Sequence, residues 1–252
     1  MCLVVFSWKT DSKNRLTLLA NRDEFFERPT ESACFRGNTL SGKDLQCGGT
    51  WLGVSRQGKV AVITNFRDPP AHRASAKSRG LLVSDFLDSS CSAKDFAAQI
   101  SSHRARYNPF NLLLYDGQVL ISYSSQTDTF AEVAPGTHAL SNHHLDSDWP
   151  KVKRVKKLFS HLLNRDKLHY PEDYLNVMED PKQAEDSELP ETGVSLEWEQ
   201  RLSPIFIKSA EYGTRSTSLL LIDNQNRIRF TEKSHYPDRK SLITCDETFI
   251  VP

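Results

Sequence analysis

The sequence lacks the cysteine spacing that a disulfide framework or a zinc site requires. Its cysteines are odd in number and form no Cys-x-x-Cys pair; they are Cys2, Cys34, Cys47, Cys91 and Cys245. Neither a disulfide-stapled secreted fold nor a metal site is therefore indicated. We expect the cysteines to be reduced and the protein to be cytoplasmic.

An excess of charge and a long apolar run are also missing. Lysine plus arginine and aspartate plus glutamate both number 32, so there is no basic surplus of the kind that gives affinity for nucleic acids or membrane surfaces. The apolar run after Met1 is too short for a signal-peptide core, and no other run is long enough to span a bilayer. We expect a small-molecule ligand, no nucleic-acid partner and no stable membrane insertion.

Blocks of predicted strands and helices alternate along the chain. Apolar runs bounded by turn residues predict strands at 2–8, 15–20, 49–55, 58–66, 110–117, 118–125, 137–142, 215–223, 227–233 and 247–252. Helices are expected at 78–89 and at 92–107, where Ser92 and Asp95 have the spacing of a helix start. This order predicts an α+β fold with two sheets between helical layers, as a single domain over 1–252.

Two segments late in the chain have contrasting patterns. Residues 148–164 carry apolar residues at helical spacing and predict an amphipathic helix with a solvated basic face that includes Lys151. Residues 179–200 are acidic, contain proline and have few aliphatic residues, which predicts a mobile surface loop.

A cysteine directly after the initiator methionine is the first candidate functional residue. Cys2 is small enough for Met1 to be removed, which would place a thiol and an α-amine on one residue. An α-amine titrates near pH ~8 and can take the thiol proton, so Cys2 could act as a nucleophile without a histidine. The alternative is that Cys2 is a small buried hydrophobe in the strand that "LVVF" predicts.

Charged and amide side chains gather where the other strands end or begin. Asn21, Arg22, Asp23 and Glu24 follow the strand predicted at 15–20, although such a run could also be an exposed charged turn. Asn65 and Asn142 each end a strand, and asparagine is a suitable oxyanion donor. Arg215 begins a late strand. A complete set of roles for nucleophilic chemistry is therefore present.

Taken in order, these residues resemble the N-terminal nucleophile hydrolases, within them the choloylglycine hydrolase and penicillin V acylase group. The resemblance implies Cys2 as nucleophile, with Arg22, Asp23, Asn65, Asn142 and Arg215 completing the catalytic set. The acylases usually have Gly-Arg-Asn-x-Asp where this chain has Asn-Arg-Asp-Glu. Whether Asp23 or Glu24 faces the Cys2 amine is left open by that difference.

The chain is more similar still to the NRDE family, which takes its name from the residues found here at 21–24. "MC", "ANRDEF", "GGTWLG", "LSN" and "YGTR" all look like motifs of that family. The resemblance implies a four-layer αββα fold of the N-terminal nucleophile hydrolase type and a cytoplasmic or mitochondrial location. It also implies involvement in haem trafficking, or alternatively in acyl-coenzyme A or lipid handling. Asn21, Glu24 and Trp51 are its candidate ligand-binding residues.

Two functions from different classes are consistent with these features. As a carrier, the protein would bind haem or an acyl anion, using the basic loop that contains Arg67, Arg73, Lys77 and Arg79, and pass it to a transient protein partner. As an enzyme, it would use Cys2 to hydrolyse a non-peptide linear amide or an acyl thioester. We predict ligand handling, with hydrolysis as the alternative and no required cofactor. The adjacent His143 and His144 would point to opposite faces of a strand, so neither is predicted to bind iron.

Overall fold

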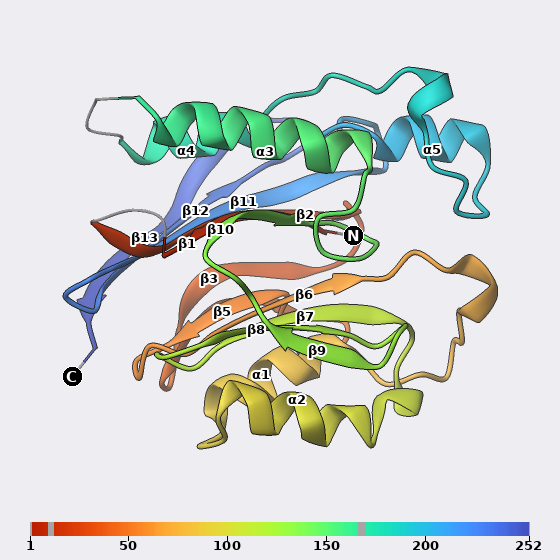
Figure 1. Ribbon diagram of the computed structural model, residues 1–252. Helices are drawn as coiled ribbons and strands as arrows, with labels where there is room; N and C mark the ends of the chain where they lie inside the picture. Colours follow the sequence, from red (N-terminus) through yellow and green to blue (C-terminus); the bar gives the residue numbers. More distant parts are fainter. Residues whose placement is uncertain (1, 10–12, 166–169, 252) are drawn as a thin grey trace.

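Two antiparallel sheets lie face to face, with helices on both outer sides, in the computed structural model of the protein (Figure 1). The structure describes residues 2–9, 13–165 and 170–251. The predicted removal of Met1 and the last residue of the strand predicted at 247–252 lie outside these ranges. The predicted α+β, four-layer αββα arrangement is confirmed.

The first sheet contains the N-terminal strand at an inner position. Its order is β10 (Gly136–Leu140), β1 (Cys2–Trp8), β2 (Asn14–Phe25), β11 (Tyr212–Asp223), β12 (Arg227–Ser234) and β13 (Leu242–Ile250). In this register Cys2 is paired with Arg22, and Asp23 is paired with Thr214. The sheet therefore brings the start of the chain beside the Asn-Arg-Asp-Glu motif.

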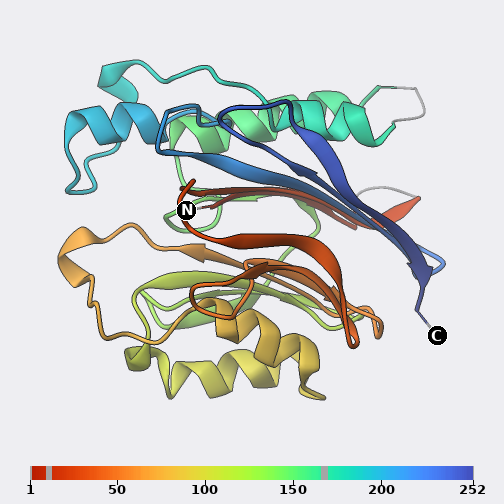
Figure 2. The same ribbon diagram turned by 180° about the vertical axis from the view of Figure 1, so that it is seen from behind.

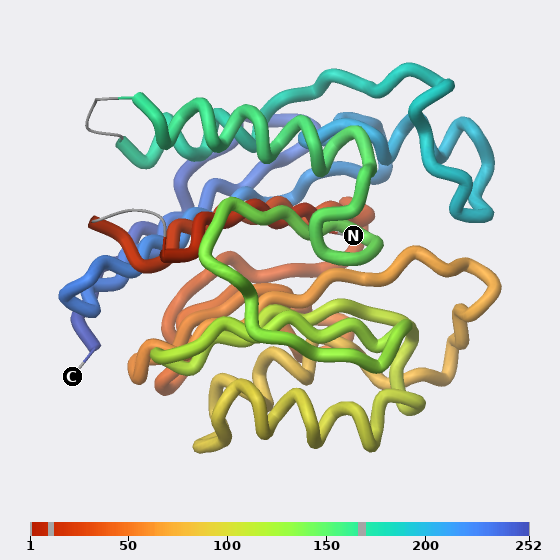
Figure 3. The backbone as a smooth tube through the Cα atoms, viewed as in Figure 1, coloured from red at the N-terminus to blue at the C-terminus, as the bar shows by residue number. Residues whose placement is uncertain are grey.

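The second sheet follows the order of the sequence. It contains β3 (Thr30–Arg36), β4 (Thr39–Asp44), β5 (Leu52–Ser55), β6 (Val60–Asn65), β7 (Phe110–Tyr115), β8 (Leu120–Ser124) and β9 (Thr129–Glu132). The chain passes between the sheets after β2 and again after β9, and the tube view shows the second crossing as the green segment that leads into β10 (Figure 3).

The helices form the two outer layers. α1 (Gly80–Asp88) and α2 (Ala93–Ser101) cover the second sheet, while α3 (Pro150–Leu163) and α4 (Pro171–Val177) cover the first, with α5 (Leu196–Leu202) near one end of that layer (Figures 1 and 2). Short 3-10 turns complete the set: η1 (Pro69–Ala71), η2 (Arg104–Arg106) and η3 (Asp186–Glu188). Ser92 caps α2 by accepting a hydrogen bond from Asp95 N at 3.1 Å, as its spacing predicted. None of the helices in the described ranges is long and apolar enough to cross a membrane.

Alternating side chains of β1 supply two different cores. Val4, Phe6 and Trp8 lie in the core between the sheets, and Leu3 and Val5 lie in the core beneath α3 and α4. Both faces of the strand are thus buried, which explains why its sequence is continuously apolar. Cys2 belongs to the inter-sheet side, so its side chain is directed toward the space between the two sheets.

Several boundaries differ from those predicted. The strand expected at 15–20 continues through the whole Asn-Arg-Asp-Glu motif to Phe25, and β3, β4 and β9 were not predicted. The acidic segment 179–200 contains η3 and most of α5, and Glu199 within it is buried, so it is not the wholly exposed loop that was expected. Its mobility stays a prediction. Lys151, assigned to the solvated face of α3, is buried with 3% of its surface exposed.

Candidate functional site

A polar cleft of about 390 Å³ opens at the end of the sheets where β1 begins. Its charged lining residues are five cations and three acids: Arg22, Arg28, Arg73, Lys77 and Arg79, and Asp23, Glu24 and Asp44. Cys2, Trp51 and Asn65 also line it. Most residues predicted for the site are therefore brought together by the fold.

Cys2 lies in this cleft as a nearly buried residue, with 8% of its surface exposed. The Ser141 hydroxyl lies 3.5 Å from the Cys2 carbonyl oxygen and ties β1 to the segment after β10. Burial raises the pKa of the Cys2 thiol. Because its surroundings do not ionise it, the thiol needs a proton acceptor before it can attack a carbonyl.

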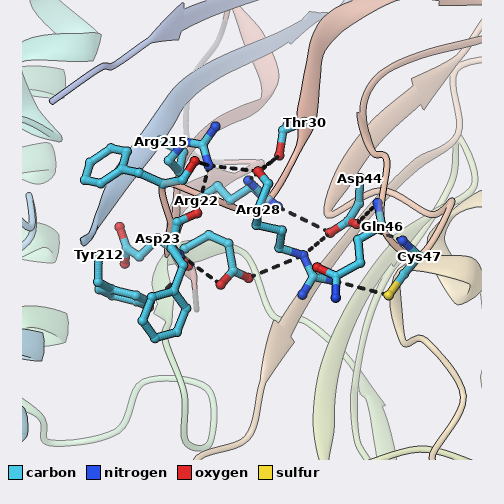
Figure 4. Close-up of polar contacts among 12 residues, drawn as sticks. Arg22, Asp23, Arg28, Thr30, Asp44, Gln46, Cys47, Tyr212 and Arg215 are labelled. Atoms are coloured by element: carbon cyan, nitrogen blue, oxygen red, sulfur yellow. Dashed lines mark hydrogen bonds and ion pairs between the residues drawn. The ribbon is translucent and has the colours of Figure 1, made fainter. Parts of the chain in front are cut away.

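The motif residues 21–24 point alternately to the two faces of β2. Asp23 is buried, and its Oδ1 accepts a hydrogen bond of 2.7 Å from the Thr214 hydroxyl. The Tyr212 hydroxyl donates to the Asp23 backbone carbonyl at 3.2 Å (Figure 4). Burial raises the pKa of Asp23. Glu24, by contrast, accepts from Phe25 N at 3.0 Å and lies at the cleft rim, so Asp23 is the fixed carboxylate of the pair.

Arg22 crosses from the first sheet to the second. Its guanidinium donates to the Thr30 hydroxyl at 3.1 Å and to Asp44 Oδ2 at 3.3 Å (Figure 4). It also lies 4.3 Å from the Trp51 ring centre. Asp44 also accepts a 2.6 Å bond from Arg28 Nε. Although burial opposes it, the hydrogen bond from Arg28 helps to lower the pKa of Asp44, so this carboxylate stays ionised between two guanidinium groups.

Arg28, Thr30 and Asp44 are site residues that the sequence did not reveal. Thr30 and Asp44 belong to the unpredicted β3–β4 hairpin, and Arg28 precedes it. A prediction of that hairpin could have drawn attention to the charged residues at its base.

The two predicted oxyanion residues are in contact with each other. Asn142 Nδ2 donates to the Asn65 carbonyl at 2.9 Å, and Arg67 N donates to the Asn142 carbonyl at 2.7 Å. Asn65 lines the cleft, whereas Asn142 is fully buried behind it. The segment after β6 and the segment after β10 are thus fastened together beside Cys2.

Three predicted site residues contact other parts of the molecule. The Asn21 amide donates to the Met178 and Ile205 carbonyls at 2.8 and 2.9 Å on the helical side of the sheet, so Asn21 lies outside the cleft. Arg67 forms an ion pair of 2.6 Å with Glu199 and does not line the cleft. Arg215 Nη1 donates to the carbonyls of Phe25, Phe26 and Arg28, which fixes the turn after the motif instead of holding charge at the Cys2 thiolate.

The remaining basic residues and Trp51 do line the cleft. Trp51 is placed there by Gly42, because a Cβ at position 42 would lie 2.3 Å from the indole ring. Arg79 lies one residue before α1 and donates to the Pro109 carbonyl at 3.0 Å. His143 and His144 pack against the Phe66 ring, outside the cleft. Across the described ranges, no three His, Cys, Asp or Glu side chains are grouped so as to hold a metal ion.

These layers and this topology are those of the N-terminal nucleophile hydrolases. The chain is similar in structure to the Cys2→Ala mutant of conjugated bile acid hydrolase from Clostridium perfringens, with a TM-score of 0.53, 9% identity, and 99% and 96% of the two chains covered. At this level of identity the likeness shows the fold alone.

Similarity in sequence defines the family. The model of the family "Transport and Golgi organisation 2" matches residues 1–237. The chain is 34% identical over 258 residues to the Transport and Golgi organization 2 homologues of Mus musculus and of Homo sapiens, with 93% of each chain covered. The protein therefore belongs to the Transport and Golgi organisation 2 family, which confirms the predicted NRDE membership.

Proposed function

We propose that the protein is an N-terminal cysteine hydrolase that acts on a linear amide or an acyl thioester carrying a negative charge. The observation that supports this most is the position of Cys2 in a cleft with Arg22, Asp23 and Asn65. Arg22, Arg28, Lys77 and Arg79 give the cleft its positive character and favour an anionic substrate.

The proposed reaction requires Met1 to be removed. The free α-amine of Cys2 takes the thiol proton while the sulfur attacks the substrate carbonyl. The tetrahedral intermediate collapses to an acyl thioester on Cys2, and the leaving amine or thiol takes the proton. Water then hydrolyses the thioester and regenerates the thiol. Asp23 holds the α-amine in this scheme, and the segment around Asn65 faces the oxyanion.

Turnover by matched proteins tests this proposal. Wild type and Cys2→Ala are assayed with N-acyl amides and acyl thioesters, each with and without a carboxylate on the acyl chain, after intact mass has confirmed Met1 removal. We expect many turnovers by wild type and by Cys91→Ala, which lies outside the cleft, and none by Cys2→Ala. Retention of Met1, or equal rates for wild type and Cys2→Ala, would refute the proposal.

Haem handling is the second candidate, and the guanidinium groups of the cleft favour it because they could pair with propionates. Haem also presents a wide apolar face, and the large apolar side chains that line the described cleft are only Trp51 and Ile63. Saturable haem binding at low micromolar concentration, about −8 kcal/mol, weakened by Arg22→Ala, would support this candidate. Weak binding that does not saturate would exclude it.

The cytoplasmic location and a protein partner that accepts the ligand also stay predictions.

A further inference from the structure

A second pocket, of about 430 Å³, lies on the first sheet, and no described residue lines both it and the Cys2 cleft. Its walls come from residues 206–209 before β11, from residues within 235–241 between β12 and β13, and from the chain after β2 and after α4. The proposed reaction uses none of these residues. The pocket therefore requires a separate explanation.

One wall of this pocket is anchored by a chain of buried hydrogen bonds. The Thr217 hydroxyl donates to Asn21 Oδ1 at 2.7 Å, and the Thr217 oxygen lies 2.9 Å from His235 Nε2. Because the Thr217 proton is already used, Nε2–H of His235 is the donor of this second bond, and Nδ1 accepts from the Ser241 hydroxyl at 2.8 Å. The connection between β12 and β13 is thus fixed close to both of its ends.

The buried histidine contributes shape to the pocket and no positive charge. His235 is 4% exposed, and burial lowers its pKa to about 4, so the ring is neutral near pH 7. The positive charge of the pocket, called here the basic pocket, comes from Lys208, Arg239 and Lys240, which are exposed.

No carboxylate compensates these three cations. Glu179 is the acid among the described lining residues, and it forms an ion pair with Lys233. Asp238, in the same connection as two of the cations, does not line the pocket. Over the ranges that the structure describes, none of the three cations forms an ion pair. Like charges around one cavity repel each other, and a bound anion would relieve that repulsion.

Aromatic rings hold two of the three cations at the pocket. The guanidinium of Arg239 lies 3.7 Å from the Tyr236 ring centre, and Lys208 Nζ lies 5.6 Å from the ring centre of Phe206. A cation packed on a ring loses less side-chain freedom when it binds a ligand. Phe26 and Tyr236 also line the pocket and are partly exposed, so a ligand can contact ring surface as well as positive charge.

We propose that the basic pocket is a second ligand site, which binds a small phosphate monoester that carries an aromatic ring. A phosphate monoester brings about two negative charges near pH 7 and three acceptor oxygens, which match three cations. The guanidinium of Arg239 suits bidentate contact with a phosphate, and the aromatic ring of the ligand packs against Phe26 and Tyr236. This site does not depend on the proposed hydrolase function.

A titration with phenyl phosphate, followed by ¹H–¹⁵N NMR, tests the site in the full chain. We expect saturable shifts of the backbone amides of 206–209 and of the connection 235–241, because these segments line the basic pocket. The Cys2 cleft is also basic, so the amides of 72–80 report any binding there. Saturable shifts at 72–80 alone, or shifts that do not saturate anywhere, would overturn the proposal.

Two further probes separate the parts of the ligand. Glycerol phosphate has the charge without the ring, and phenol has the ring without the charge. We expect phenyl phosphate to bind about threefold more tightly than glycerol phosphate and at least about tenfold more tightly than phenol. Equal affinities of phenol and phenyl phosphate would overturn the anion site. Equal affinities of the two phosphates would overturn the contact with the aromatic ring.

Charge-removing variants locate the site on the molecule. Arg239→Gln should weaken phenyl phosphate binding about tenfold, and Lys208→Gln and Lys240→Gln about threefold each. Lys94→Gln removes the same charge from the exposed face of α2 and should leave the affinity unchanged, as should Arg79→Gln in the Cys2 cleft. Wild-type affinity in Arg239→Gln and in the double variant Lys208→Gln/Lys240→Gln, or an equal loss in Lys94→Gln, would contradict the proposal.

Discussion

At the scale of residues, the two faces of β2 carry different residues of the site. Arg22 and Glu24 point into the cleft region, where Arg22 meets Asp44 and Trp51 of the second sheet. Asp23 is buried against Thr214. Asp23 is therefore the fixed carboxylate of the pair, while Glu24 lines the cleft; that Asp23 holds the Cys2 amine is part of the proposed reaction.

Lys151 should leave a signature in the pH dependence of stability. Its folded pKa of about 8 lies below the ordinary value of 10.5, so in this range the unfolded chain binds more protons and stability rises with pH. Compared with Lys151→Gln, wild type should gain up to about 3 kcal/mol in free energy of unfolding between pH 7.5 and about 10.5. Urea denaturation across this range measures the difference, and a constant difference between the two proteins would argue against a buried, titrating lysine.

Lys153→Gln is the matched control for that experiment. Lys153 lies two residues further along α3, is 63% exposed and pairs with the exposed Asp148. Its replacement should change stability by less than about 0.5 kcal/mol at any of these pH values.

The sequence predicted the residues of the cleft better than their contacts. Cys2, Arg22, Asp23, Asn65 and Arg79 could be named because charged or amide residues at strand ends are unusual enough to notice. Lys151 could not, because a lysine in an amphipathic helix is ordinarily solvated, and its contact with Leu202 joins residues far apart in the chain. Asn21 lies outside the cleft because β2 continues beyond position 20 and turns that side chain to the other face.

At the scale of elements, the segment after β6 is held against α5 by the Arg67–Glu199 ion pair. Glu199 also accepts bonds from the Thr192 backbone and hydroxyl, so the acidic segment is fastened to the site from the side of α5. This buried acid sits in a stretch whose composition predicted only a surface loop. Composition averages over the whole segment, so it cannot show that Glu199 forms a buried ion pair with Arg67.

Breaking this ion pair should lower the free energy of unfolding more than a surface substitution does. Glu199→Gln leaves the Arg67 guanidinium buried without its counter-charge, and we expect a loss of about 3 kcal/mol in free energy of unfolding. Glu197→Gln on the same helix is the control, because Glu197 is 76% exposed and should contribute less than about 0.5 kcal/mol. Similar small effects for both variants in urea denaturation would show that the buried pair does not fasten α5.

Close packing of two loops shapes the cleft wall beside α1. A Cβ at Gly49 would lie 2.3 Å from the Gly80 backbone, so Gly49→Ala must separate the β4–β5 connection from the start of α1. We expect a loss of about 2 kcal/mol and a weaker ligand affinity, since both segments line the cleft. Gly117→Ala is the comparison. The space around Gly117 is open, so this substitution should lower the free energy of unfolding only through the strain of its positive-φ backbone. Equal losses, with unchanged ligand affinity in both variants, would contradict this steric account.

At the scale of the whole molecule, the four layers bring separated parts of the chain to one opening. The start of β1, the end of β2, the β4–β5 connection, the end of β6 and the loop before α1 all line it. The layer order was predictable from blocks of strands and helices. The β3–β4 hairpin was not, because its polar and small residues lack the apolar alternation that marks a strand.

A covalent acyl group on Cys2 is the direct test of the central claim. Processed wild type is mixed with an N-acyl amide or acyl thioester that carries a carboxylate, quenched in acid within seconds, digested and analysed by peptide mass. The account predicts an acyl increment on the N-terminal peptide that appears before product, disappears as substrate is consumed, and is absent from Cys2→Ala. Product formation by wild type with no acyl group on Cys2 at any time, and at the same rate by Cys2→Ala, would contradict it.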